Sequence, residues 1–368
     1  MQIKDIITAL EQMAPPPLQE DYDNAGLLTG SASWECKGII VALDATEPVI
    51  KEALEKGCNL VVAHHPIVFK GIKKLNGKNY VEQTVITAIK NDIAIYAIHT
   101  NLDNVAKGVN GKIADLLGLQ NRKILAPKNG LLQKLVVFVP LAAKEALLNA
   151  MFAAGAGNIG NYSECSFSGK GDGSFKAGAE ANPYVGEKAV RHLEPEERVE
   201  VILPAWLQPK VLAAMTAAHP YEEVAYDVYT LANSYQETGS GILGELGEPV
   251  DEASFLQRLQ QKFGTPVIKH SPFTGKIVQK VALCGGAGSF LTGNAKAAGA
   301  DAYLTADLKY HEFFDAEGKL LLIDIGHYES EQFTIDLLFD LLQEKFPNFA
   351  VLKTGINTNP VQYFHSKS

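Results

Sequence analysis

Two adjacent histidines at the end of an apolar run constrain the fold of this chain more than any other feature. His64 and His65 close the segment Asn59-Leu-Val-Val-Ala-His-His-Pro66. The aliphatic run predicts a buried strand, and the proline after it cannot continue a hydrogen-bonded ladder. Since neighbouring strand residues point to opposite faces, two adjacent histidines can reach one site only where the strand ends. The sequence therefore predicts a site at the end of this strand.

Three further segments also place ligand-type residues directly after a predicted buried strand. In each of them two such residues lie four positions apart, so both side chains share one face wherever a helix begins there. The pairs are His99 with Asp103, Asp307 with His311, and His327 with Glu331. A simpler interpretation is a local turn held by Asp and Asn side chains, or an acidic helix N-terminus. The repetition at four strand ends makes a metal site the leading hypothesis.

The types of donor narrow the choice of metal. Imidazoles mixed with carboxylates suit zinc, manganese or iron better than calcium or magnesium. No thiolate is needed, so an open, catalytic kind of site is favoured over a closed structural one. The number of donors is compatible with two ions bridged by a carboxylate, which could clamp a phosphate or activate water. Asp307 and His311 are candidates for orienting a ligand or for proton transfer.

Composition excludes several classes of function. A formal net charge of -9 argues against nucleic acid as the main partner, because phosphate backbones bind basic surfaces. The four cysteines are widely scattered and form no zinc or redox motif, which is typical of reduced thiols in a cytoplasm. Residues 1–10 predict an amphipathic helix, and the sequence shows neither a signal peptide nor a membrane span. We therefore expect a cytoplasmic protein without a membrane partner.

The order of predicted elements indicates a discontinuous α/β domain. Aliphatic strands alternate with helices over residues 1–127 and again over 234–368, which favours a parallel or mixed sheet covered on both faces. Residues 128–233 instead follow the order strand, helix, two strands, helix, strand, which suits a ferredoxin-like insert. The segments Val41-Ala-Leu-Asp44 and Val281-Ala-Leu-Cys284 open similar strand–helix–strand units in the two outer parts. The predicted fold is an α/β protein whose duplicated mixed-sheet outer domain is interrupted by a ferredoxin-like α+β insert.

Glycine-rich and polar stretches allow further interpretations. The segment Leu283-Cys-Gly-Gly-Ala-Gly-Ser289 follows a predicted strand and could present amides to an anion, although tight packing of strand against helix is the commoner cause. No Lys-Ser or Lys-Thr follows it, which excludes a nucleotide P-loop. The turn-rich residues 126–130 and the polar residues 232–240 are expected to bound the insert.

Five motifs in the outer parts resemble those of a known family, in the same order. They are Asp23-Asn-Ala-Gly-Leu27, Val62-Ala-His-His-Pro66, His99-Thr-Asn-Leu-Asp103, Thr305-Ala-Asp-Leu-Lys-Tyr-His311 and Gly326-His-Tyr-Glu-Ser-Glu331. The chain resembles the Nif-three-like family of dinuclear metal proteins, whose members are also called GTP cyclohydrolase I type two homologues. Its middle part looks like the insert of the long bacterial subtype, which resembles the PII and CutA folds. One departure is Tyr22, where the family usually has a tryptophan.

The resemblance implies a ligand set and an assembly. By position, the implied metal ligands are His64, His65, Asp103, His327 and Glu331. Either Glu331 or Asp103 would bridge two divalent ions. His99 is not one of the family's ligands, and with Asp307 and His311 it is a candidate for acid–base chemistry. The family also implies a toroidal homohexamer whose metal sites face an internal cavity.

The family name implies opening of the guanine ring of GTP with loss of formate. A dinuclear site serves phosphoesterases and amidohydrolases equally well, because fold and ligands alone do not define a substrate. A third interpretation is a metal-binding regulatory or metal-delivery protein whose PII-like module senses a small ligand or a partner. These alternatives stay open at the level of the sequence.

Overall fold

The structure is a computed structural model that describes residues 1–364. It divides into two compact units, one made of Met1–Pro127 together with the chain from Gln236 onward, and one made of Lys128–Tyr235. Both units combine helices with sheets, so the predicted α/β character is confirmed. No helix within residues 1–364 has both the length and the apolarity needed to cross a lipid bilayer.

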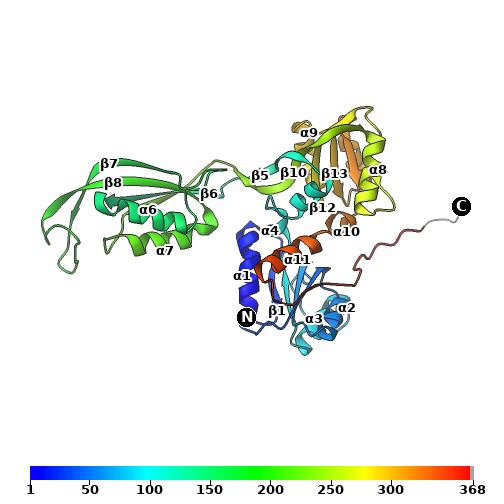
Figure 1. Cartoon of the computed structure of the whole chain (residues 1–368), viewed down its shortest axis with the longest axis horizontal. Coiled ribbons are helices and arrows are strands. Elements are labelled where there is room, and N and C mark those ends of the chain that lie inside the picture. The colour runs from blue at the N-terminus through cyan, green and yellow to red at the C-terminus, as the bar shows by residue number, and fades with distance from the viewer. Residues whose placement is uncertain (365–368) are drawn as a thin grey trace. The chain divides into compact units, whose positions relative to one another are not determined.

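The first sheet of the larger unit is mixed and has the strand order β1-β4-β3-β2-β15 (Figure 1). Four of its strands run parallel, and β1 is antiparallel to β4. The strands are β1 (Gly26–Thr29), β2 (Ile39–Asp44), β3 (Leu60–His65), β4 (Ala94–Ala97) and β15 (Val351–Lys353). Because neighbouring parallel strands end at the same edge, the carboxyl ends of β2, β3 and β4 lie together.

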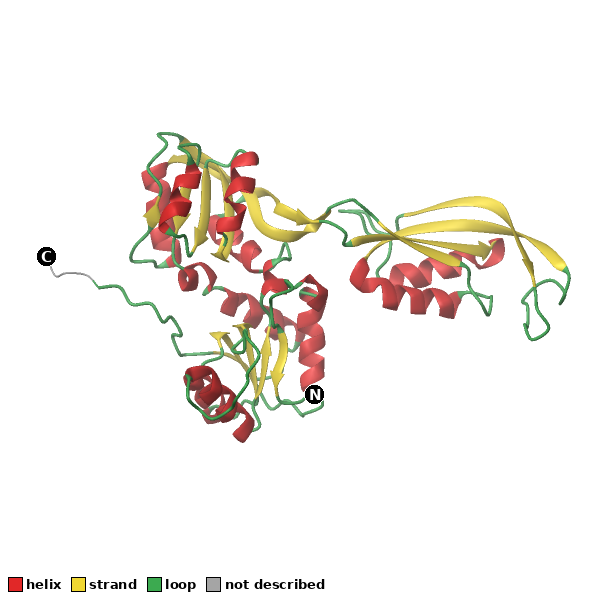
Figure 2. Cartoon of the chain, turned by 180° about the vertical axis from the view of Figure 1, so that it is seen from behind, coloured by secondary structure: helices red, strands yellow, loops and turns green. Residues whose placement is uncertain are grey.

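Helices cover both faces of this sheet (Figure 2). They are α1 (Ile3–Met13), α2 (Glu47–Glu55), α3 (Tyr80–Lys90), α5 (Val109–Leu117) and α11 (Thr334–Lys345). Alternate residues of each strand enter two separate cores, as the period of two requires. Ile40 and Ala42 pack with α2 and α3, whereas Ile39 and Val41 pack with α1, α5 and α11. The continuous aliphatic run of β2 thus follows from burial on both sides.

The second sheet of the larger unit has the order β11-β14-β13-β12-β10-β5. Its parallel strands β12, β13 and β14 are flanked by the antiparallel β10 and β11. The strands are β5 (Gln120–Lys128), β10 (Tyr235–Asp251), β11 (Lys269–His270), β12 (Ile277–Ala287), β13 (Ala302–Ala306) and β14 (Leu321–Asp324). Val281 and Leu283 of β12 share one core with Val41 of the first sheet, so a common apolar core joins the two sheets.

Helices α8 and α9 pack on this sheet, and short helices follow its parallel strands β13 and β14. Helix α8 (Glu252–Phe263) packs Phe255 into the common core. Helix α9 (Thr292–Ala297) packs Ala295 against the opposite face of the sheet. The short helices are η5 (Tyr310–Ala316) after β13 and α10 (His327–Glu331) after β14. A helix does begin at His327, which is the condition under which His327 and Glu331 share one face.

The smaller unit contains a four-stranded antiparallel sheet of order β7-β8-β6-β9. Along the chain its elements are β6 (Leu132–Pro140), α6 (Lys144–Ala153), β7 (Ser166–Lys176), β8 (Arg191–Pro204), α7 (Gln208–Ala218) and β9 (Tyr226–Thr230). Helices α6 and α7 contact each other, and both pack on one face of the sheet. That face consists of the apolar residues that alternate along β6 and β8.

The two units divide within the two segments expected to bound the insert, and both segments are partly strand. β5 ends at Lys128, within the turn-rich residues 126–130, and β10 begins at Tyr235, within the polar residues 232–240. The one glycine of the second segment, Gly239, lies in β10 and allows close packing. A Cβ on Gly239 would overlap the carbonyl oxygen of Ala126, so glycine lets β10 approach β5.

Candidate metal centre

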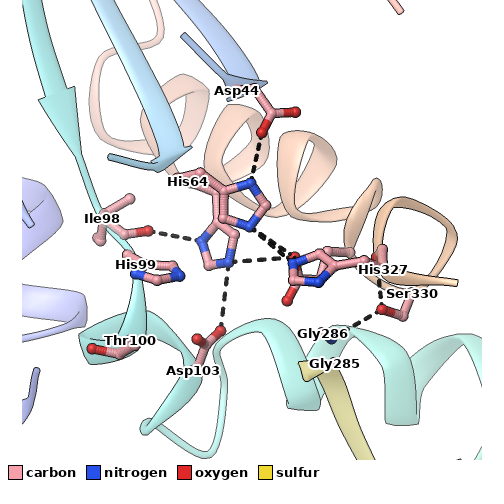
Figure 3. Close-up of polar contacts among 12 residues, drawn as sticks. Asp44, His64, Ile98, His99, Thr100, Asp103, Gly285, Gly286, His327 and Ser330 are labelled. Atoms are coloured by element: carbon pink, nitrogen blue, oxygen red, sulfur yellow. Dashed lines mark hydrogen bonds and ion pairs between the residues drawn. The ribbon is translucent and has the colours of Figure 1, made fainter. Parts of the chain in front are cut away.

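The carboxyl ends of parallel strands in both sheets bring the predicted side chains together (Figure 3). β3 ends in His64 and His65, and His99 lies two residues beyond β4. Asp103 follows on the short helix α4 (Thr100–Asp103). From the second sheet, β14 leads into α10. Open α/β sheets bind ligands at this edge, because loops rather than ladder bonds occupy it.

His64 is fixed in one tautomer by the backbone. Its side chain is fully buried, and its Nδ1 lies 2.8 Å from the carbonyl oxygen of Ile98. A carbonyl can only accept, so Nδ1 carries the hydrogen and Nε2 holds a lone pair. Burial lowers the pKa of His64 to about 3, which keeps the ring neutral. A neutral imidazole with a free Nε2 lone pair is the form that ligates metals.

The same arrangement recurs at three other imidazoles. In each case Nδ1 lies within 2.8 Å of a carboxylate oxygen, so Nε2 is the ring nitrogen that could ligate a metal. The pairs are His65 with Asp44, His99 with Asp23, and His327 with Asp307. Metal-binding histidines characteristically donate their other ring N–H to a carboxylate or a carbonyl, because this fixes the ring and makes it more basic.

Glu331 lies at the centre of the cluster and is almost completely buried. Its Oε2 is 3.0 Å from Nε2 of His65 and 3.0 Å from Nε2 of His327. Burial opposes ionisation, but these two imidazoles outweigh it and hold the pKa of Glu331 well below its usual range. A glycine makes room for the carboxylate, since a Cβ on Gly286 would overlap Oε1.

In the glycine-rich segment of β12, two amides are satisfied inside the protein. The amide of Gly286 donates to Ser330 Oγ at 3.0 Å, and the amide of Gly285 donates to Asn110 Oδ1 at 2.9 Å. Both amides are used inside the protein. The commoner interpretation of this segment, tight packing, is the one that the structure supports.

A divalent cation fits the unsatisfied atoms of the cluster. Nε2 of His64 and Oδ1 of Asp103 are buried and have no hydrogen-bond partner among the described residues. The His64 lone pair faces Asp103 Oδ1 at 3.6 Å and Glu331 Oε2 at 3.9 Å. Lone pairs and carboxylates facing one another are repulsive in a low-dielectric interior, and a cation between them would satisfy all three.

Among residues 1–364, three groups of ligand atoms lie close enough to hold an ion, each with its atoms within 4.8 Å of one another. One group contains His65, His327 and Glu331, the second His64, Asp103 and Glu331, and the third His64, His65 and His99. Burial and the neighbouring Glu331 raise the pKa of Asp103 well above its usual range, which reflects the concentration of negative charge. The donors are nitrogen and oxygen only, a set that suits borderline divalent ions.

The remaining predicted residues have different surroundings. Asp307 lies outside helix η5, with φ +56, and contacts His327 instead of sharing a helical face with His311. His311 is exposed and packs its ring against Tyr310 and Phe314. The structure thus brings Asp307 to the cluster, while the recorded contacts of His311 are with its own helix.

Two carboxylates that hold imidazoles were not among the candidates from the sequence. Asp44 ends β2 beside His65, its register partner on β3. Burial opposes ionisation of Asp23, but hydrogen bonds from His99 and Thr100 together lower its pKa to about 2. Asp44 could have been found from its position, because it too follows a buried aliphatic run. Asp23 opens the motif Asp23-Asn-Ala-Gly-Leu27, but nothing local indicates that it holds an imidazole, because its partner His99 lies 76 residues away.

The fold and the cluster define a mixed α/β protein with a histidine–carboxylate site of the kind that holds metal ions. A family model described as Duf34/NIF3 (NGG1p interacting factor 3) matches residues 1–360, and the chain belongs to this family.

Individual relatives cover nearly the whole chain. A Halalkalibacterium halodurans protein named "GTP cyclohydrolase 1 type 2 homolog" is 37% identical over 364 residues, covering 97% of this chain and 98% of that protein. A Bacillus subtilis protein of the same name is 38% identical over 327 residues, 88% of each chain. The crystal structure of a Bacillus cereus protein related to NIF3 superposes with a TM-score of 0.87 at 37% identity, covering 99% of both chains.

Proposed function

We propose that this chain is a divalent-metal-dependent hydrolase with two ions in one site. The sharing of Glu331 by two ligand groups carries this proposal. His65 and His327 would complete one group and His64 and Asp103 the other, with Glu331 as the bridge. Zinc, manganese and iron are the ions that suit these donors.

The chain's own residues would divide the work around the ions. When bound, such ions polarise a substrate oxygen and make water a better nucleophile at neutral pH. Asp307 holds the ring of His327, and Asp44 holds that of His65. His99 would transfer a proton through its Nε2. Asp23 is bonded to Nδ1 of this ring, so Nε2 is the nitrogen that stays available to the cluster. The predicted proton-transfer role of His311 stays part of this proposal and predicts a lower turnover for His311→Ala with unchanged metal content.

GTP is the substrate that we propose first, on the basis of the name carried by the relatives. In the reaction, water adds to the carbon that lies between the two nitrogens of the five-membered ring of guanine. One C–N bond of this carbon breaks, which gives a formamide. A second water then cleaves the remaining C–N bond and releases formate and an amine. Two waters are consumed and no redox partner is required.

A lysine-rich loop beside the cluster supports a polyanionic substrate. Residues 66–79 follow His65 directly and contain four lysines and no acidic residue, although the chain as a whole is acidic. These lysines are exposed: Lys70, Lys73, Lys74 and Lys78. The Phe69 ring lies 5.6 Å from that of His99, which places the start of the loop at the cluster. Opposite charge there would favour phosphate groups.

The experiment is formate release from GTP by protein loaded with zinc, manganese or iron, beside the variant Glu331→Gln. We expect turnover in the wild type and its loss in the variant. Glu344→Gln, which changes an exposed carboxylate on α11, is the matched control and should keep full turnover. A wild type that carries two ions and releases no formate would reject the cyclohydrolase.

The lysine loop favours a second candidate, a metal-dependent phosphoesterase. Phosphate release from GTP and from simple phosphate monoesters, measured on the same samples, distinguishes it from ring opening. If neither product forms with two ions bound, the regulatory or metal-delivery interpretation takes precedence.

The assembly and the insert complete the proposal. We expect a homohexamer, with a mass in sedimentation about six times the 39.8 kDa of one chain. The strand order of the smaller unit, β7-β8-β6-β9, supports the proposed ferredoxin-like insert. A PII-like ligand site in that unit would be the regulatory element of the alternative interpretation.

A further inference from the structure

An extended segment after β15, residues 354–363, runs from the first sheet to the metal centre, and we call it the C-terminal strap. It contains no helix or strand and appears as the dark red trace in Figure 1. At its start, the amide of Thr354 donates to the carbonyl of Val41 at 2.9 Å, which continues the pairing of β15 with β2. The start of the strap is therefore held to the first sheet by a backbone hydrogen bond.

In its middle, the strap contacts the carboxylate that holds His65. The Thr358 hydroxyl donates to Asp44 Oδ2 at 2.5 Å, while the other oxygen of Asp44 lies 2.8 Å from Nδ1 of His65. Both oxygens of Asp44 are thus used, one by the strap and one by the imidazole. Figure 3 shows Asp44 above the histidines of the cluster.

The next residue of the strap contacts the other half of the centre. Asn359 Nδ2 donates to Glu329 Oε1 at 3.2 Å. Glu329 is buried on α10, the helix that carries His327 and Glu331. Two consecutive residues thus connect the element that orients His65 with the helix that supplies the opposing ligands.

We infer that Thr358 and Asn359 are positioning residues that fix His65 relative to α10 through Asp44 and Glu329, and that this contact sets the affinity of the metal centre. The inference rests on the proposed metal site. Carboxylates behind ligating histidines matter because they fix the direction of the ring, and a carboxylate without its second partner can rotate. The strap is the only described segment whose side-chain bonds reach both Asp44 and Glu329.

The chain provides a matched control on the same segment. The hydroxyl of Thr354 also donates to a carboxylate, that of Glu52 on α2, and the amide of Gly355 donates to the same group at 2.9 Å. Among the described residues, Glu52 makes no hydrogen bond to a histidine of the cluster. Thr354→Val therefore removes the same type of bond from the strap without touching the centre.

The experiment titrates the full-length protein with Co²⁺, which reports ligand geometry through its visible absorption. We expect Thr358→Val to lower Co²⁺ affinity between about 10- and 100-fold and to change the absorption spectrum. Thr358→Ser keeps the hydroxyl and should match the wild type, as should Thr354→Val. Asn359→Leu should weaken binding in the same direction as Thr358→Val. Thermal unfolding of each variant shows whether it is folded.

Two outcomes overturn the inference alone. One is wild-type Co²⁺ binding and spectrum in Thr358→Val, and the other is an equal loss in Thr354→Val, which would mean that the strap acts through general stability. A wild type that binds no Co²⁺, zinc, manganese or iron would instead reject the proposed metal centre, and the inference with it. If Thr358→Val fails to fold, the comparison of Asn359→Leu with Thr354→Val decides.

Discussion

The Glu331 carboxylate and the His65 imidazole lie 3.0 Å apart although 266 residues separate them in the sequence. Each comes from a different sheet of the larger unit, one from the end of β3 and one from the helix after β14. Their contact exists only when both sheets share the common core. Metal binding should therefore report directly on the packing of the two sheets against each other.

Replacing Gly286 by alanine should remove metal from the centre. A Cβ there would overlap Glu331 Oε1, and the backbone has φ +60, which favours glycine by about 1–2 kcal/mol. We expect a lower metal content measured by mass spectrometry of the purified protein. Gly293→Ala is the control, because a Cβ on this α9 residue meets nothing within 4 Å. Normal metal content in Gly286→Ala would contradict the packing argument.

His99→Gln should separate proton transfer from metal binding. If His99 acts as an acid–base group, turnover should fall by a factor of about 100 or more, while both ions stay bound. Metal analysis and formate release on the same preparation check this. Loss of an ion would instead make His99 a ligand, in agreement with the group that it forms with His64 and His65.

Asp307→Asn should weaken metal binding without removing a ligand. The carboxylate lies 2.7 Å from His327 Nδ1, and its charge makes the ring a stronger donor. Losses of about 10- to 100-fold in affinity are usual for such partners. The measurement is a competition titration against a chromophoric chelator. Asp315→Asn changes an exposed carboxylate on η5 and should leave the affinity unchanged.

Alkylation should distinguish the cysteines by burial. Burial raises the pKa of Cys36 to about 11, so its reactive thiolate is scarce at pH 8 and forms only as the pH rises through that value. Cys58 and Cys284 are buried too, whereas Cys165 is half-buried. We expect iodoacetamide at pH 8 to label Cys165 first, as read by peptide mass mapping. Early labelling of Cys36 would show that the first sheet opens locally.

The sequence could predict the strand ends but not their partners. His64, His65 and His327 follow aliphatic runs that must be buried, so their position at a sheet edge follows from periodicity. The i,i+4 spacing of His327 and Glu331 predicted their contact, because a helix does begin at His327. The same spacing wrongly predicted that Asp307 and His311 share a helical face. The backbone at Asp307 is left-handed, and the helix starts only at Tyr310.

The roles of Asp23 and Thr358 behind the histidines could not be predicted, for a physical reason. Thr358 meets Asp44 across 314 residues and Asp23 meets His99 across 76, so each contact depends on tertiary packing. A lone threonine or aspartate in a loop is usually a turn residue. In the same way, the polar residues 232–240 are expected only to bound the insert, whereas Gly239 lies in β10 and packs directly against Ala126 of β5.

The distance along the chain between the two halves of the centre also sets when it can form during synthesis. At about 5–20 residues per second, a ribosome needs roughly 15–50 seconds to proceed from His65 to Glu331. Throughout that interval the nascent chain presents His64 and His65 without Glu331 and α10, and the smaller unit is completed in between. If the proposed centre binds two bridged ions, it can therefore acquire them only after Glu331 has been synthesised.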